Sequence, residues 1–122
     1  MSPGKHILVV EDDPDNSDLI AYVLRSSGCQ VTASTTMSEA LALARGGNFD
    51  LILLDGRLPD GSGVDLLGKL RTFNQRTPAV IVSADAYPAD RERGMAAGAQ
   101  AYLIKPCSPD DLQMVVALLL TE

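Results

Sequence analysis

The sequence is short of several features, and each shortage excludes a class of protein. It has one histidine, His6 in the first predicted strand, so histidine-based triads and most zinc sites are poor candidates. Two cysteines, Cys29 and Cys107, are too few for a disulfide framework in a chain of 122 residues, and we expect two reduced thiols in a cytoplasmic protein. The longest apolar run, Met114 to Leu120, falls far below the ~20 residues that span a bilayer, so no membrane segment is expected.

Basic residues are also in the minority. Ten Lys and Arg stand against 16 Asp and Glu, and the resulting net charge of −6 argues against nucleic acid as a direct partner. The composition is otherwise that of an ordinary globular protein, with 46% hydrophobic residues. A chain of 122 residues has the size of one domain, and we expect a single domain over residues 1–122.

Five short apolar runs are each followed by a helical pattern. Three of the runs are rich in Val, Ile and Leu without alternation, which is typical of strands covered on both faces. Strands that alternate with helices predict an α/β fold, a doubly wound (βα)5 flavodoxin-like sandwich whose parallel sheet has the order 2-1-3-4-5. The expected strands are His6–Val10, Gln30–Ser34, Leu51–Leu54, Ala79–Val82 and Ala101–Ile104.

The expected helices carry readable end signals. The first begins with Asp13 as its cap and Pro14 in its first turn, and Gly28 closes it. Asp13 is therefore expected to cap this helix and not to bind a metal. The other helices begin at a capping box over 36–39, at Ser62, at a weaker pattern over 88–97, and at Ser108.

Polar residues follow four of the five predicted strands, at the edge of the sheet where doubly wound proteins bind ligands. They are Glu11 and Asp12, then Asp55, then Ser83, then Lys105. Because the first and third strands are neighbours, Glu11, Asp12 and Asp55 should converge, and such carboxylates repel unless a cation lies between them. A sparse, oxygen-only ligand set favours Mg²⁺. With a lysine and a hydroxyl at the same edge, the set contains what phosphoryl transfer needs.

These residues stand in four motifs whose order and spacing resemble the response regulator receiver family of two-component signalling. The motifs are Ile-Leu-Val-Val-Glu-Asp-Asp-Pro (7–14), Leu-Ile-Leu-Leu-Asp-Gly-Arg-Leu-Pro-Asp-Gly-Ser-Gly (51–63), Val-Ser-Ala (82–84) and Tyr-Leu-Ile-Lys-Pro (102–106). The resemblance covers nearly the whole chain. It implies a phosphorelay switch that takes a phosphoryl group from a sensor histidine kinase or a phosphotransfer protein. It also implies that the chain catalyses only its own phosphorylation and dephosphorylation.

The resemblance implies a role for each residue around the metal. Asp55 would be the phosphoacceptor, and Asp12 would bind Mg²⁺ directly, with Mn²⁺ as an alternative ion. Glu11 would reach the metal through water, and the main-chain carbonyl of Arg57 would be a further ligand. Lys105 would pair with Asp55 and then with the phosphate.

The resemblance also implies a switch on the other side of Asp55. Ser83 would bind the phosphoryl oxygens, and Tyr102 would turn inward as Ser83 moves toward them. Without the resemblance, Ser83 reads as a strand-end hydroxyl and Tyr102 as a packing residue. Arg57 and Asp85 would border the path of the attacking water and tune the lifetime of the phosphorylated state, and their opposite charges could pair.

Two positions depart from the commoner pattern of the family. Cys107 stands where many members carry Phe, which predicts looser packing beneath the last helix. Gly56 follows the phosphoacceptor where a bulkier apolar residue is frequent. We expect neither residue to touch the reacting groups directly. Asp60 to Gly63 is interpreted as a turn and a helix start, not as a phosphate-binding loop.

The last helix predicts an output surface. Its residues Leu112, Val115, Val116 and Leu119 form one stripe that belongs against the sheet. Met114, Ala117, Leu118 and Leu120 are left without an obvious core to enter. Contiguous exposed apolar area marks an interface, so we expect Met114 and Leu118 to meet a second receiver or an effector. This surface belongs to the face made by the fourth helix, the last strand and the last helix.

Two other functions fit the residues of this sequence less well. A haloacid-dehalogenase-like phosphatase would need a second aspartate two residues after Asp55, where this chain has Arg57. A degenerate receiver that never takes phosphate would usually lack an acid at position 11 or 12, or Lys105, and all three are present.

Overall fold

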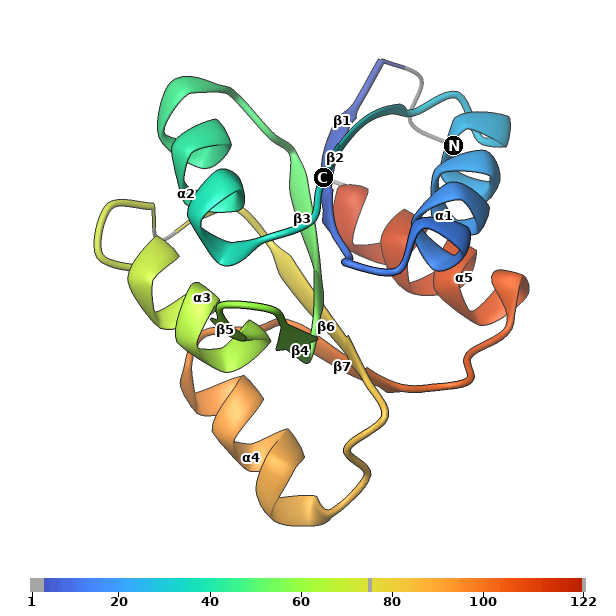
Figure 1. Ribbon diagram of the computed structural model, residues 1–122. Helices are drawn as coiled ribbons and strands as arrows, with labels where there is room; N and C mark the ends of the chain where they lie inside the picture. Colours follow the sequence, from blue (N-terminus) through green and yellow to red (C-terminus); the bar gives the residue numbers. More distant parts are fainter. Residues whose placement is uncertain (1–3, 75, 122) are drawn as a thin grey trace.

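The fold is a five-stranded parallel sheet between two layers of helices. A computed structural model describes residues 4–74 and 76–121, so the ends of the predicted 1–122 domain lie outside the described residues. The strand order is β2-β1-β3-β6-β7, which confirms the predicted order 2-1-3-4-5 once a short hairpin is set aside (Figure 1). The strands are β1 (His6–Val10), β2 (Gln30–Ser34), β3 (Leu51–Asp55), β6 (Ala79–Ser83) and β7 (Ala101–Ile104).

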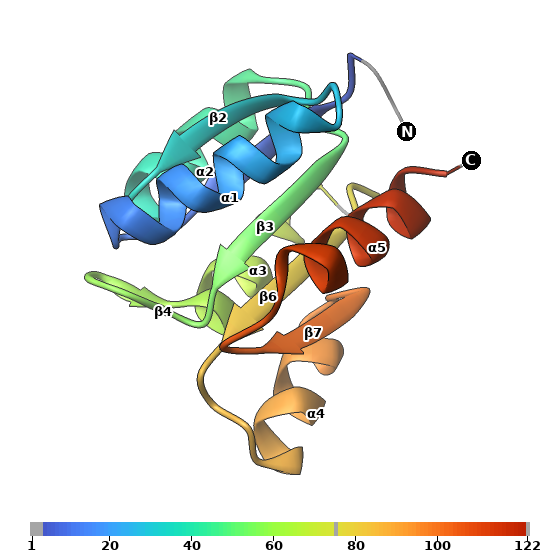
Figure 2. The same cartoon turned by 90° about the vertical axis from the view of Figure 1, so that its right-hand side faces the viewer.

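Helices cover both faces of the sheet. The helices are α1 (Pro14–Ser26), α2 (Met37–Gly46), α3 (Gly63–Leu70), α4 (Pro88–Ala96) and α5 (Pro109–Leu120). Figure 2 shows α1 and α5 together on one face, and the other three lie on the opposite face (Figure 1). Strand side chains alternate between two cores, so that Leu8 and Ile52 pack on the α2 and α3 side while Ile7 and Leu51 pack on the α1 and α5 side.

The helix ends follow the predicted signals. Asp13 caps α1 by accepting a hydrogen bond from the Asp15 amide at 3.1 Å. Ser62 and Ser108 cap α3 and α5 in the same way. Thr36 caps α2 as predicted by accepting from the Glu39 amide at 3.1 Å, but the Glu39 carboxylate accepts in return from the amide of Thr35 and not of Thr36. No helix in the described part of the chain has the length and hydropathy that a bilayer-spanning helix requires.

A short hairpin after β3 was not expected from the sequence. It pairs β4 (Arg57–Leu58) with β5 (Gly61–Ser62) in antiparallel fashion. At its tip the Asp60 carboxylate accepts hydrogen bonds from the amides of Met37 at 2.7 Å and Ser38 at 3.0 Å, at the start of α2. These hydrogen bonds lower the pKa of Asp60. The hairpin therefore fastens the segment that follows Asp55 to a neighbouring helix.

The structure of α5 contradicts one expectation drawn from the sequence and is consistent with another. Leu120, predicted to have no core to enter, is 6% exposed and packs in the core, so that prediction was wrong. The reason is that Leu120 continues the i, i+4 spacing of Leu112 and Val116 and so shares their buried stripe. Met114 and Leu118 are 59% and 68% exposed, on the side of α5 away from the sheet.

Candidate functional site

Three acidic side chains converge where β1 and β3 end. Glu11 and Asp12 follow β1 directly, and Asp55 is the last residue of β3, the neighbouring strand. Glu11, Asp12 and Asp55 each offer one carboxylate oxygen, and these three oxygens lie within 4.8 Å of one another. Asp12 is exposed, while Glu11 and Asp55 are buried. The convergence predicted from the strand order is therefore present.

One lysine balances part of this negative charge. Lys105, at the end of β7, places its Nζ 3.1 Å from Asp55 Oδ1 and 3.2 Å from Glu11 Oε1. Burial alone would lower the pKa of Lys105, but the hydrogen bond and charge of Asp55, together with the charge of Glu11, outweigh it and raise this pKa. The Lys105–Pro106 peptide bond is cis.

The electrostatics of Glu11 show that the charge is not fully compensated. Burial, together with the hydrogen bond and charge of the adjacent Asp55 carboxylate, raises the pKa of Glu11 to about 7, against the opposing effects of the Asp13 amide and Lys105. The Lys105 ammonium thus pairs with two of three converging carboxylates, those of Glu11 and Asp55. Hard oxygen donors with excess negative charge are the ligands that a divalent cation of the Mg²⁺ type prefers, so the residues present fit such an ion. The main chain of Arg57 also reaches the cluster, since its amide donates to Asp55 Oδ1 at 3.3 Å.

A hydrogen-bonded chain lies on the other side of Asp55. Ser83, the last residue of β6, is 2% exposed, and its Oγ accepts a hydrogen bond from the Asp85 amide at 3.1 Å. The Asp85 carbonyl in turn accepts from the Tyr102 hydroxyl at 2.8 Å. Tyr102 is 6% exposed and therefore points inward. Two hydrogen bonds thus connect Ser83 to Tyr102 through Asp85.

Arg57 and Asp85 form an ion pair at the mouth of the site. Arg57 comes from the hairpin and Asp85 from the loop after β6, and Nη2 and Oδ1 lie 2.8 Å apart. The arginine lowers the pKa of Asp85. The side chains are 80% and 33% exposed, so water screens the pair. The pairing expected from the sequence is present, and its effect on phosphoryl lifetime stays a prediction.

Gly56 lies so close to Ser83 that a side chain at position 56 would not fit, which the sequence did not predict. A Cβ on Gly56 would lie 2.2 Å from Ser83 Oγ and 2.5 Å from Ser83 Cβ. The one sign of this contact in the sequence is the glycine directly after Asp55, at a position where a larger residue is usual.

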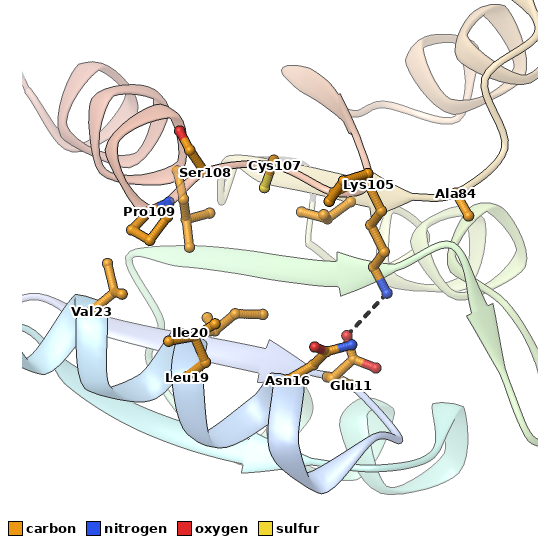
Figure 3. A pocket seen from close by; sticks show the side chains of 13 residues that line it. Glu11, Asn16, Leu19, Ile20, Val23, Ala84, Lys105, Cys107, Ser108 and Pro109 are labelled. Carbon is orange, nitrogen blue, oxygen red and sulfur yellow. Dashed lines mark hydrogen bonds and ion pairs between the residues drawn. The ribbon is translucent and has the colours of Figure 1, made fainter.

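An apolar cavity of about 490 Å³ opens beside the site (Figure 3). Leu19, Ile20 and Val23 of α1 form one wall, and the segment that joins Lys105 to α5 forms the other. Cys107 lines this cavity, in agreement with the looser packing expected at that position. The cavity ends at the Glu11–Lys105 ion pair, which is drawn as a dashed line in Figure 3. Sequence reasoning missed both the cavity and this ion pair.

Comparison with known proteins identifies relatives of the same kind. Residues 7–117 match the family described as the response regulator receiver domain. The chain is 36% identical over 114 residues to the probable transcriptional regulatory protein TcrX of Mycobacterium tuberculosis, covering 93% of this chain and 49% of that protein. It is 35% identical over 106 residues to the cell cycle transcriptional regulator CtrA of Caulobacter vibrioides, covering 87% and 46%. The chain thus spans about half the length of these two regulators.

Solved structures give the same result. A CheY-like response regulator receiver domain protein from Methanospirillum hungatei superposes with a TM-score of 0.92 at 32% identity, covering 96% of this chain and 94% of that one. The chemotaxis response regulator CheY4 of Vibrio cholerae superposes with a TM-score of 0.90 at 25% identity, covering 95% and 98%. With the family match over nearly the whole sequence, these likenesses show that the chain belongs to the response regulator receiver domain family of two-component signalling.

Proposed function

We propose that Asp55 accepts a phosphoryl group from the phosphohistidine of a sensor histidine kinase or a phosphotransfer protein, in a reaction that requires Mg²⁺. The observation that carries this proposal is the position of the Asp55 carboxylate. It lies within 4.8 Å of two further carboxylates and 3.1 Å from the Lys105 ammonium, at the edge of the sheet where ligands of this fold bind.

Each side chain has a part in this reaction. An Asp55 carboxylate oxygen attacks phosphorus, the bond from phosphorus to the donor nitrogen breaks, and the donor imidazole leaves. Lys105 shifts from Asp55 to the transferred phosphoryl oxygens, and the Ser83 hydroxyl donates to them. Asp12, Asp55, the Arg57 carbonyl and, through water, Glu11 would hold Mg²⁺ or Mn²⁺. The ion, when bound, supplies positive charge to the phosphoryl oxygens.

A small-molecule donor tests this function without knowledge of the kinase. Acetyl phosphate or phosphoramidate with Mg²⁺ should label the wild-type protein, and intact-mass spectrometry measures the product. Asp55→Asn should abolish labelling, whereas Asp18→Asn, at an exposed aspartate of α1, should not. Undiminished acyl-phosphate labelling of the Asp55→Asn protein would refute the assignment.

The exposed side of α5 favours a second proposal, about output. Met114 and Leu118 are large, apolar and exposed, and Ile104 of β7 is 42% exposed. We propose that the face made by α4, β7 and α5 binds a second receiver or an effector, and that phosphorylation tunes this contact through Ser83 and Tyr102.

Charge placed on this face tests the second proposal. Replacement of both Met114 and Leu118 by Glu should leave folding and Asp55 labelling intact, because neither side chain is in the core. It should weaken self-association or effector binding, as measured by sedimentation with and without phosphorylation or by pull-down of a co-encoded effector. A double variant that associates like the wild type in both states would contradict the proposal.

A further inference from the structure

The backbone at the end of β3 lies unusually close to the side chain at the end of β6. A Cβ built on Gly56 would stand 2.2 Å from Ser83 Oγ, 2.5 Å from Ser83 Cβ and 3.4 Å from Ser83 Cα. Rotation of the Ser83 hydroxyl would relieve the first contact but not the second, because Cβ is fixed by the backbone. With the backbone as it stands in this chain, a side chain at position 56 therefore requires a shift of about 0.9 Å between Gly56 and the end of β6, the difference between 2.5 Å and an ordinary contact of 3.4 Å.

Neither partner in this contact has room to retreat. The Gly56 amide donates to the Val82 carbonyl at 3.1 Å, and the Gly56 carbonyl accepts from the Gly63 amide at 3.0 Å. A Cβ on Gly63 would itself lie 2.5 Å from the Asp55 carbonyl, so the start of α3 closes on this segment from the far side. Gly56 is thus held between β6 and α3.

The end of β6 carries groups whose position matters for the proposed chemistry. The Ser83 carbonyl accepts from the Lys105 amide at 2.8 Å, and the Ser83 hydroxyl accepts from the Asp85 amide. Asp85 then holds Tyr102 through its carbonyl. A displacement at Ser83 therefore reaches the hydroxyl that donates to the phosphoryl group, and the tyrosine behind it.

We propose that Gly56 is a positioning residue for the Ser83 hydroxyl. Its missing Cβ leaves the space that the Ser83 side chain occupies next to the residue after Asp55, so the hydroxyl stands ready to donate to the phosphoryl oxygens. The proposal rests on phosphorylation of Asp55 and names the residue that sets the place of one donor in that reaction. Since errors of about 1 Å in a reacting geometry cost up to about 100-fold in rate, a methyl group at position 56 should slow phosphoryl transfer by about 10- to 100-fold.

Variants at both positions separate positioning from folding. Gly56→Ala should slow labelling by acetyl phosphate at saturating Mg²⁺, where a change in Mg²⁺ affinity at the neighbouring ligands Asp55 and Arg57, measured by calorimetry, no longer limits the rate. In a Ser83→Gly background the same change should cost nothing, since only the ordinary 3.4 Å contact to Cα remains. The Asp85 amide donates to Ser83 Oγ, so its chemical shift in nuclear magnetic resonance spectra should change in Gly56→Ala.

The matched control is Gly68→Ala, at an exposed glycine of α3 with no atom within 4 Å of its added Cβ. An unlabelled wild-type protein would refute the proposed function itself. Labelled wild type with Gly56→Ala equal to Gly68→Ala would overturn only the positioning role, as would an equal rate loss in the Ser83→Gly background. If Gly56→Ala does not fold, restored folding in Gly56→Ala with Ser83→Gly supports the contact, and a double variant that stays unfolded overturns it.

Discussion

The two ends of the central sheet treat polar side chains in opposite ways. At the amino end, the His6 amide donates to Asp50 Oδ2 at 2.8 Å, and the Ala79 amide donates to Gln100 Oε1 at 2.7 Å. At the carboxyl end, by contrast, the carboxylates of Glu11, Asp12 and Asp55 converge, and Lys105 pairs with two of them, Glu11 and Asp55. Ser34 Oγ, the one buried side-chain polar atom without a hydrogen-bond partner in residues 4–74 and 76–121, also lies at the carboxyl end.

The difference separates polar groups that stabilise the fold from polar groups that are available to bind a ligand. Paired amides and carboxylates at the amino end close off the ends of strands and stabilise the fold. Converging carboxylates at the carboxyl end are unfavourable without a ligand, and such groups gather at functional sites. Substitutions at the carboxyl end should therefore change chemistry more than stability, and substitutions at the amino end should do the reverse.

The largest expected effect is at Asp12. Asp12→Ala removes the only side chain besides Asp55 proposed to bind the metal directly, so labelling by acetyl phosphate should slow by about 100-fold at limiting Mg²⁺. The metal-free protein should be no less stable than the wild type, because one of three converging negative charges is gone. Both quantities are compared with those of Asp18→Ala. An Asp12→Ala protein that is destabilised yet labelled at the control rate would contradict the expectation that substitutions at the carboxyl end change chemistry more than stability.

Glu11 should make the stability of the metal-free protein depend on pH. Its pKa is about 7 in the folded chain against an ordinary value of 4.5, so the folded state binds the extra proton between these values. The unfolding free energy of the metal-free protein should therefore fall as pH rises through this window, by up to about 3 kcal/mol. Urea unfolding in chelator measures this loss.

Two conditions should remove the loss of stability. Glu11→Gln has no carboxyl group to titrate, and Mg²⁺ favours the ionised form of Glu11. Stability that falls equally in the wild type and in Glu11→Gln would show that another group is responsible.

At the amino end, Gln100→Ala should act on stability alone. It leaves the amide of Ala79, a fully buried residue, without its acceptor, which costs about 1–2 kcal/mol of unfolding free energy. Labelling of Asp55 should match that of the wild type. Glu92→Ala, at an exposed position of α4, is the control for denaturant unfolding. Slower labelling of the Gln100→Ala protein would contradict the expectation that substitutions at the amino end change stability and not chemistry.

The smallest expected effect on the fold is at Arg57, whose pair with Asp85 is exposed. Arg57→Asn should leave stability unchanged, because exposed ion pairs contribute little. It should shorten the lifetime of the aspartyl phosphate, because the arginine no longer covers the path of the attacking water. A phosphate-release assay measures this lifetime after removal of the donor, and an unchanged or longer half-life counts against the role of Arg57.

The parts of the fold that follow from local pattern were predictable. Runs such as Leu51 to Leu54 are buried on both faces, and their length and composition set the strands. Caps such as Asp13 and Ser108 act within a few residues, so the sequence alone locates them. The convergence of Glu11 with Asp55 followed from the order of two strands and the rule that parallel strands end at one edge.

The remaining features depend on contacts between distant residues. The β4–β5 hairpin has two residues in each strand, too few for any periodicity, and it is held by Asp60 on α2. The Glu11–Lys105 pair joins residues 94 positions apart. The fit of Gly56 against Ser83 depends on strand spacing to within an ångström, which no residue pattern reports.

The most direct test of the central claim is to locate the phosphoryl group. The protein is incubated with acetyl phosphate and Mg²⁺, the acyl phosphate is reduced with borohydride, and peptides are sequenced by mass spectrometry. The account predicts homoserine at position 55, with Glu11 and Asp12 unmodified and no product when the metal is chelated. Reduction product at another carboxylate, or at position 55 without any divalent ion, would contradict it.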